Sequence, residues 1–391
     1  MLGITVWGLA VGQALLITGN ILLVSVTALI GHKLAPDLSL ATLPIATQFL
    51  GLMGITLPAA FMMKAVGRKA GFFIGNMIGI VGATLAFYAL QNAHFTLFCI
   101  ATLLLGMSIG VGQQYRFAAI ENAPSDKTPQ AISLVMGAGI IAAVLGPNMA
   151  IWAEFTFPDT QYLGAFAALL VLYVLTTLLI LALPLKQPTV EEQSGIPRSY
   201  STLLKQPELI AAITSGVIGY GVMTLVMTAT PLAMHGHGFR FDSTATVIQW
   251  HVLGMFAPSF FTGKLIQKFG TTSIIQSGCL LLILCVVLTQ LGRSYWHFWI
   301  ALLFLGIGWN FTFIGATTLL TKTYQPADKA KVQGLNDFMV FTGATIGSVL
   351  AGYWQNIYGW EILNLLMIPF IVVAMISVWM STRKPLSIKS D

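Results

Sequence analysis

Two pairs of side chains with soft metal-ligand character lie at helical spacing in the second half of the chain. Met223 and Met227 are four residues apart, and so are His251 and Met255. A four-residue step returns to the same face of a helix, so each pair presents two ligands on one side. Thioethers and imidazole suit Cu(I) better than they suit hard cations. The spacing therefore predicts a copper path built from these four residues.

The sequence positions also suggest how the two pairs meet. If the helices that carry them are antiparallel neighbours, Met227 lies level with His251 and Met223 lies level with Met255. The two levels are then about 6 Å apart, because a helix rises about 1.5 Å per residue. Methionine is abundant, with 16 in 391 residues, so either pair alone arises readily by chance. Ordinary packing of Met between helices therefore stays open as the alternative.

The helices that must hold these ligands are membrane helices. The hydrophobic fraction is 56% and the charged fraction is 8%, whereas a soluble protein has about a quarter charged residues. Apolar stretches of about 20 residues, each long enough to cross the hydrocarbon core, recur along the chain. The first has no basic segment before it, so we expect a retained helix and not a cleaved signal peptide. We expect an all-α integral membrane protein with twelve transmembrane helices, at 4–31, 40–63, 70–90, 95–120, 129–153, 161–184, 208–233, 243–263, 272–292, 296–321, 330–356 and 360–381.

Lysine and arginine decide the expected orientation, because positively charged loops stay in the cytoplasm. With the N-terminus inside, most basic residues fall on inner loops, whereas Lys33, Arg240 and Arg293 fall outside. We therefore expect both termini to be cytoplasmic. This bias accounts for the net charge of +6, so no nucleic-acid partner is expected. The three cysteines all fall in apolar segments and are expected to be small buried side chains.

A polar stretch divides the chain into two halves. We expect an N-terminal six-helix bundle at 1–184, a cytoplasmic linker at 185–206, a C-terminal six-helix bundle at 207–382 and a cytoplasmic tail at 383–391. The halves are weakly similar at an offset of about 200 residues, as in transporters built from repeats. The matching positions are Pro58 with Pro258, Gly67 with Gly270, and Asp126-Lys127 with Asp328-Lys329.

The loop after the second helix resembles the signature of the major facilitator superfamily. Gly67, Arg68 and Lys69 fit the end of the family pattern Gly-x-Leu-x-Asp-Arg-x-Gly-Arg-Lys, but Lys64 stands at its acidic position. In the family that acidic residue is thought to latch the second helix to the eleventh. Asp337 is a candidate swapped partner for Lys64, with two separately solvated charges as the alternative. The resemblance covers the whole chain and implies two pseudo-symmetric six-helix bundles that work by alternating access.

The segments around the copper ligands resemble the CcoA-like branch of this superfamily, which carries Met-xxx-Met in the seventh helix and His-xxx-Met in the eighth. The resemblance implies import of copper across the bacterial inner membrane, for cytochrome oxidase assembly. We expect a monomer embedded in the lipid bilayer, with copper as substrate and no cofactor. The branch also includes relatives implicated in riboflavin transport, so an organic cofactor such as riboflavin remains an alternative cargo. A copper sensor or assembly partner that does not transport is a third interpretation.

Further residues are candidates for metal entry. Met234, His235 and His237 lie at the expected external mouth of the seventh helix. They could capture a metal ion there, and the alternative is an ordinary solvated loop.

Other polar residues are candidates for lining a cavity or for gating. Gln13 and Asn20 share one face of the first helix and either line a cavity or bond to a neighbouring helix. Arg116 closes the fourth helix, where a charge at membrane depth calls for a cavity or a partner, unless it lies at the interface. Trp309 and Asn310 either border the path of an organic ligand or serve packing. No P-loop or hydrolase triad occurs in the sequence, so no enzyme is expected.

Overall fold

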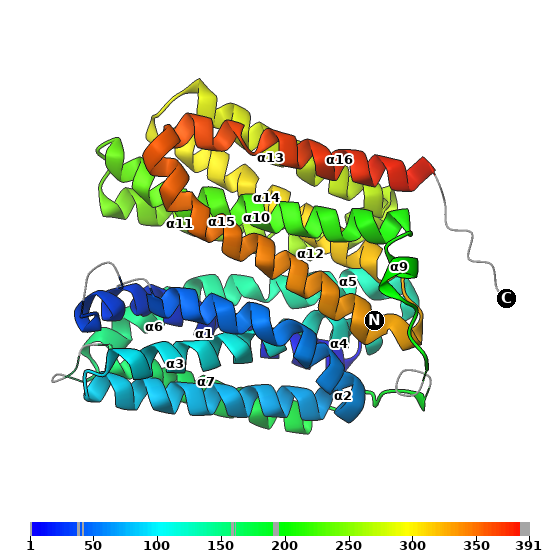
Figure 1. The fold of residues 1–391 in the computed structure, drawn as a ribbon, viewed down its shortest axis with the longest axis horizontal. Coiled ribbons are helices and arrows are strands. Elements are labelled where there is room, and N and C mark those ends of the chain that lie inside the picture. The colour runs from blue at the N-terminus through cyan, green and yellow to red at the C-terminus, as the bar shows by residue number, and fades with distance from the viewer. Residues whose placement is uncertain are drawn as a thin grey trace. The chain divides into compact units, whose positions relative to one another are not determined.

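The computed structural model of the protein describes residues 2–36, 40, 43–157, 160, 162–190 and 195–383, and these residues form helices and turns without any strand. The all-α class expected from the sequence is therefore confirmed. Figure 1 shows the helices. Their bounds are α1 Ile4–Leu34, α2 Leu43–Gln91, α3 Phe95–Gly112, α4 Tyr115–Glu121, α5 Thr128–Gly137, α6 Gly139–Phe155, α7 Leu163–Ala182, α9 Tyr200–Leu203, α10 Pro207–Gly236, α11 Phe241–Phe256, α12 Ser259–Phe269, α13 Thr271–Leu291, α14 Tyr295–Leu320, α15 Lys329–Leu365 and α16 Ile368–Arg383.

Nine helical segments of the described chain are long and apolar enough to cross a membrane. Two of them, Leu43–Gln91 and Pro326–Arg383, have 49 and 58 residues, which is enough for two crossings each. A glycine with non-helical backbone interrupts both, Gly67 in α2 and Gly359 in α15. The expected ranges 95–120 and 129–153 are each divided, into α3 and α4 and into α5 and α6. The membrane class is supported, while the number of twelve crossings stays an expectation.

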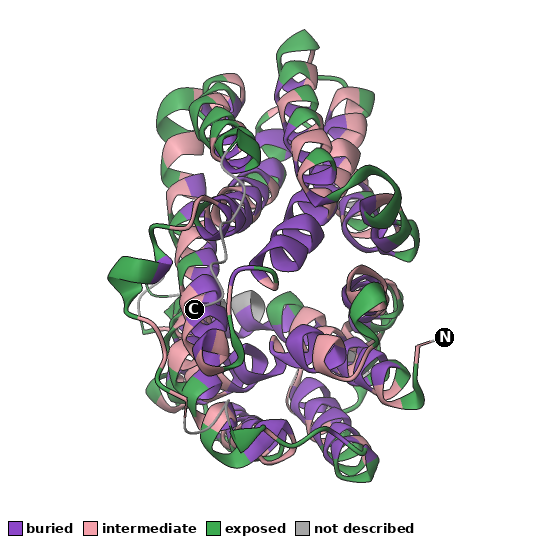
Figure 2. Ribbon diagram, turned by 90° about the vertical axis from the view of Figure 1, so that its right-hand side faces the viewer, coloured by how far each residue is buried: buried purple, intermediate pink, exposed green. Residues whose placement is uncertain are grey.

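Buried and exposed residues lie on different faces of the helices within each part of the protein (Figure 2). Many exposed side chains are large and apolar, such as Val171 and Val349. Hydrocarbon surrounds a membrane helix, so an outward apolar side chain needs no partner. The cysteines Cys99, Cys279 and Cys285 are buried and free, as expected from their apolar surroundings.

The chain forms two compact units. The first comprises Met1–Lys127 and Leu134–Gln193, and the second comprises Thr128–Ser133 and Ser194–Asp391.

The part of the expected linker from Arg198 onward packs on the second unit. The backbone N–H and Nε of Arg198 both donate to the carboxylate of Asp328, at 2.7 Å each. Lys331 Nζ donates in turn to the carbonyl of Arg198 at 2.7 Å. One ion pair and a hydrogen bond from Lys331 therefore hold the segment around Arg198 at the start of α15.

Each unit has its own packing core. In the first unit α2 packs against α3 and α7, and α1 packs against α6 and α7. In the second unit α10 packs mainly against α15, α14 and α16, and α15 crosses α10 obliquely (Figure 1). The other main pairs of the second unit are α13 with α14 and α11 with α14.

Two of the expected repeat matches occur in equivalent local structures. Gly67 and Gly270 have φ values of +84° and +88°, which glycine adopts without strain. The 3-10 turns Ser125–Lys127 and Pro326–Asp328 both precede a helix that continues the chain, α5 and α15. The matches of Gly67 with Gly270 and of Asp126-Lys127 with Asp328-Lys329 are therefore consistent with the geometry.

Helix crossings at glycine show which residues of one unit are equivalent to which residues of the other. Gly51 of α2 lies against the carbonyl of Leu103 in α3, and Gly254 of α11 lies against the carbonyl of Leu303 in α14. A side chain at either glycine would collide with that oxygen. Close approach of this kind is typical of small residues between membrane helices.

The same register corrects the match of Pro58 with Pro258. Gly51 and Gly254 are 203 residues apart, as are Gly67 and Gly270, so the position equivalent to Pro58 is Phe261. Pro58 lies inside the continuous helix α2, whereas Pro258 lies at the break between α11 and α12.

A buried asparagine holds that break together. Pro258 has no N–H and so interrupts the helical hydrogen-bond ladder. Asn310 of α14 is fully buried, and its Nδ2 donates to the Met255 carbonyl and to Ser259 Oγ, at 2.6 Å each. Its Oδ1 accepts from Thr262 Oγ1 at 2.7 Å. One side chain therefore satisfies polar groups on both sides of the interrupted helix.

We predict that Asn310→Leu lowers the free energy of unfolding by about 2 kcal/mol, because it leaves several buried polar groups without partners. The melting temperature of the purified protein in detergent measures this loss. Asn364→Leu is the matched control, since Asn364 is equally buried but donates only to the Trp360 carbonyl of its own helix. An equal loss in both variants would contradict the role given to Asn310.

Candidate functional site

The four expected copper ligands lie on α10 and α11 of the second unit. Met223, Met255 and His251 are buried, with 2%, 8% and 0% of their surfaces exposed, and Met227 is partly buried. His251 Nδ1 lies 2.9 Å from the Leu302 carbonyl of α14. A carbonyl only accepts, so Nδ1 carries the hydrogen and Nε2 keeps its lone pair. That Nε2 is buried and has no hydrogen-bond partner.

The helices α10 and α11 contact each other, as the register argument requires, but each packs more extensively against other helices. α10 packs mainly against α15 and α14, and α11 packs mainly against α14, to which the imidazole of His251 is also bonded. The described residues contain no group of three or more His, Cys, Asp or Glu side chains that could hold a metal ion. A copper site in this part of the chain would therefore need the thioethers, and the four-residue path stays a prediction.

Five aromatic rings from four helices meet in the second unit. Trp309 and Phe313 of α14 are stacked, with ring centroids 5.1 Å apart and planes at 10°. Tyr220 of α10 meets Trp309, Phe313 and Phe341 edge-on, with centroids 5.5 to 5.6 Å apart. Phe256 of α11 meets Trp309 in the same way at 6.0 Å. We call these five residues the aromatic cluster.

Trp309 is the polar member of the aromatic cluster that lacks a partner. Only 2% of its surface is exposed, and its Nε1 is buried without a hydrogen-bond partner. A buried N–H usually finds an acceptor, because leaving it unpaired is costly. From the sequence, one of two interpretations was that Trp309 borders the path of an organic ligand. No signal in the sequence indicated the aromatic cluster, because its members come from four helices.

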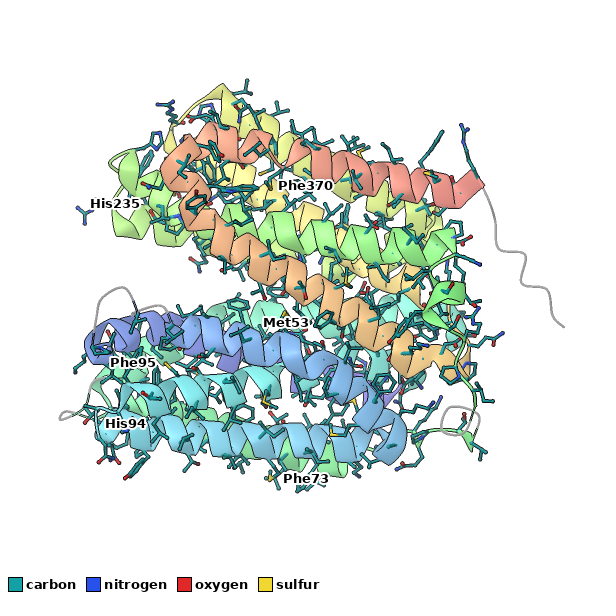
Figure 3. The ribbon with its side chains drawn as sticks, viewed as in Figure 1. Met53, Phe73, His94, Phe95, His235 and Phe370 are labelled. Carbon is teal, nitrogen blue, oxygen red and sulfur yellow. The ribbon has the colours of Figure 1, made fainter. Side chains whose placement is uncertain are left out.

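The three expected metal-entry residues differ in exposure. Met234 is fully buried, whereas His235 is exposed at the end of α10 (Figure 3). His237 Nδ1 lies 2.7 Å from the Ala233 carbonyl, and its ring meets Phe298 at 5.9 Å. Of the three, His235 has the accessibility that capture from solvent requires, and the capture role stays a prediction.

One of the two polar residues expected on the first helix, Asn20, bonds to the second helix. Gln48 Nε2 of α2 donates to Asn20 Oδ1 of α1 at 3.0 Å. Gln13, one of the two residues singled out in the sequence, is buried, and its Oε1 has no hydrogen-bond partner. Gln48 is also buried with a free Oε1. Nothing in its sequence context pointed to Gln48.

The signature segment at the Gly67 kink inside α2 is anchored to both ends of α4. Arg68 Nη2 donates to Glu121 Oε1 at 2.6 Å, and Arg68 Nη1 donates to Gln114 Oε1 at 2.9 Å. Arg116 is buried in α4, with its guanidinium 4.7 Å from the Phe117 ring. Arg116 is therefore enclosed by protein, and its role in a cavity or at the interface stays a prediction.

The expected latch pairs residues of the two units. Lys64 is partly buried in α2. Asp337 is fully buried in α15, and its Oδ1 accepts from Asn336 Nδ2 at 3.0 Å. The pairing of Lys64 with Asp337 stays a prediction.

We predict that Glu121→Gln lowers the free energy of unfolding by about 3 kcal/mol, because it takes the carboxylate from a buried guanidinium. Glu361→Gln is the control, since it removes the Arg293–Glu361 pair, in which 63% of the Arg293 side chain is exposed. That exposed pair should contribute less than about 1 kcal/mol. Melting temperatures of the two variants test the difference, and similar shifts would contradict it.

Sequence comparisons place the chain among known transporters. The Major Facilitator Superfamily model matches residues 9–319 and 241–390. The chain is 41% identical over 372 residues to the riboflavin transporter RfnT of Brucella anthropi, covering 94% of this chain and 93% of the relative. It is 30% identical to the uncharacterized transporter YdeG of Bacillus subtilis, covering 89% and 86% of the two chains.

Solved structures of low sequence identity share the fold. The fucose:proton symporter FucP of E. coli has a TM-score of 0.78 at 17% identity, covering 97% of this chain and 98% of the symporter. A bacterial homologue of the iron transporter ferroportin also has a TM-score of 0.78, at 11% identity, covering 97% of this chain and all of the homologue. With a family model and a close relative that both span most of its length, the chain belongs to the Major Facilitator Superfamily of membrane transporters.

Proposed function

We propose that the protein is a secondary transporter whose cargo is a flat heteroaromatic cofactor of the riboflavin class. The observation that carries this proposal is the aromatic cluster, with the buried and unpaired Nε1 of Trp309 at its centre. Flat aromatic rings bind ring systems by offset stacking and edge contacts, which contribute about 0.5 to 1.5 kcal/mol per pair beyond burial. The cluster therefore suits a cargo that is itself a flat ring system.

Hydrogen bonding also favours a heteroaromatic cargo. The indole N–H needs an acceptor, and an isoalloxazine ring carries carbonyl oxygens and ring nitrogens that accept hydrogen bonds. A buried donor that pairs only with the cargo discriminates strongly against a ring that lacks the acceptor.

Similarity supports the same cargo. The relative named a riboflavin transporter is 41% identical over nearly the whole length of both chains. It supports riboflavin over copper, which the methionine and histidine spacing favoured in the sequence. We infer import across the bacterial inner membrane, with both termini in the cytoplasm, from the distribution of basic residues and from the family resemblance.

We predict that cells expressing the protein take up radiolabelled riboflavin, in a host that neither makes nor imports it. Trp309→Phe keeps a ring but removes the N–H, so the half-saturating riboflavin concentration should rise about fivefold. Trp309→Leu also removes the stacking surface and should abolish most uptake.

The matched control is Trp360→Phe. Trp360 is as buried as Trp309 in the same unit, but it packs against Phe298 outside the aromatic cluster. This variant should transport as the wild type does. If cells that express the wild-type protein take up no more riboflavin than the empty host does, the proposed function is wrong.

Copper remains a second candidate because of one observation at His251. Its Nδ1 is held by a backbone carbonyl and its buried Nε2 has no partner, which is the arrangement of a metal-binding histidine and its outer-shell support. Met223 and Met255 are buried on the same two helices and are neutral ligands. A Met-rich site holds Cu(I) without burying an anion.

A side-by-side uptake measurement separates the two cargoes. If copper is carried, Met227→Ala/His251→Ala should reduce copper uptake at least tenfold, because two of four ligands are lost. If riboflavin alone is carried, no copper uptake above background should be seen in the wild type. Copper uptake that the double variant leaves unchanged would rule out the ligand path.

A further inference from the structure

The two units place Gln48 and His251 at equivalent positions. Gly106 of α3 lies against the carbonyl of Gln48 in α2, and Gly306 of α14 lies against the carbonyl of His251 in α11. Both crossings are one helical turn from the contacts of Gly51 and Gly254 already described, in the same register. Gln48 is therefore the counterpart of His251 in the first unit.

A second crossing relates the helices that lie beside them. Leu16 of α1 contacts Gly112 of α3, and Gly219 of α10 contacts Thr312 of α14. Leu16 and Gly219 are again 203 residues apart, so the counterpart of Asn20 is Met223.

The bonded pair in the first unit points to a pairing in the second unit that differs from the one expected from the sequence. Asn20 and Gln48 are hydrogen-bonded to each other. Their counterparts are Met223 and His251, whereas the antiparallel arrangement expected from the sequence placed His251 level with Met227. Asn20 and Gln48 in the first unit therefore correspond in position to Met223 and His251 in the second unit, although the side chains differ.

Each member of this equivalent pair keeps one buried polar atom without a partner. Gln48 is 3% exposed, and the donation of its Nε2 to Asn20 Oδ1 fixes the amide so that Oε1 is the free atom. His251 is fully buried with a free Nε2. Both free atoms accept hydrogen bonds. Buried acceptors are rarely left unpaired, because desolvating them is costly.

We propose that Gln48 is a specificity-determining residue, whose Oε1 accepts a hydrogen bond from a ring N–H of the cargo. The assignment rests on the proposed heteroaromatic cargo. An isoalloxazine ring has one such donor, the N–H of its imide group. Asn20 is the positioning residue, because it holds the amide of Gln48 in the accepting orientation.

The test compares riboflavin with an analogue methylated at the imide nitrogen, in proteoliposomes that contain the full-length chain. The wild type should take up riboflavin with a half-saturating concentration about tenfold lower than that of the analogue, because the methyl group removes the donor. Gln48→Leu should raise the riboflavin value about tenfold and leave the analogue value within about twofold. The preference for riboflavin should disappear.

Gln276→Leu is the matched control. Gln276 of α13 also has a buried Oε1 without a partner, and its Nε2 donates to the Met375 carbonyl at 2.8 Å. It lies on neither of the equivalent helices, so this variant should keep the wild-type preference. Asn20→Ala, which keeps Gln48 but releases its amide, should reduce the preference by a smaller factor.

The half-saturating concentrations of riboflavin and of the analogue are measured on one preparation. Their ratio therefore does not depend on how much of the protein is folded. If Gln48→Leu folds too poorly to reconstitute, Gln48→Met offers a side chain of similar length for the same ratio. A Gln48 variant that keeps the wild-type preference, or that loses both cargoes equally, overturns the assignment. A wild type that takes up neither compound overturns the proposed function itself.

Discussion

The protein depends on one constraint: inside a membrane, every polar group must find its partner within the protein. The described helices meet it in two ways. Threonine hydroxyls such as those of Thr18 and Thr176 donate to carbonyls of their own helices, and Asn310 satisfies three groups at a break. Gln48, His251 and Trp309 are among the residues that depart from this pattern, each with a buried polar atom that lacks a partner. Their cost is explained if the partner is a cargo that comes and goes.

Glycine decides where the helices of each unit can approach. The pairs α2 with α3 and α11 with α14 touch at glycines that face backbone carbonyls. The glycines and carbonyls of the two crossings occupy equivalent positions in the two units. A repeated backbone then carries different chemistry. Arg68 forms an ion pair with Glu121 after the first of the equivalent glycines, Gly67, whereas Thr271 follows the second, Gly270, and accepts a weak bond from Lys322. The fold repeats, whereas the side chains at these equivalent positions differ.

The set of predicted soft ligands and the aromatic cluster both have members in the same stretch of α11. Met255 is followed by Phe256, whose ring meets Trp309, while the carbonyl of Met255 is held by Asn310, the neighbour of Trp309. Methionine sulfur also packs well against aromatic rings. Buried methionines therefore fit a flat organic cargo as well as a copper ion, which explains how one sequence pattern accommodated both interpretations.

The sequence by itself determined the membrane class, the all-helical fold, most of the helix positions and the superfamily, because hydrophobic length and the glycine-arginine signature are local properties. It also singled out His251 and Met255, through their helical spacing, for a ligand role that stays a prediction. Only the tertiary structure decided the break at Pro258, the partner of Glu121, the aromatic cluster and the equivalence of Gln48 with His251. Each of these depends on residues from separate helices, whose contacts follow from close packing at glycines, and spacing along one helix carries no information about which neighbour it meets.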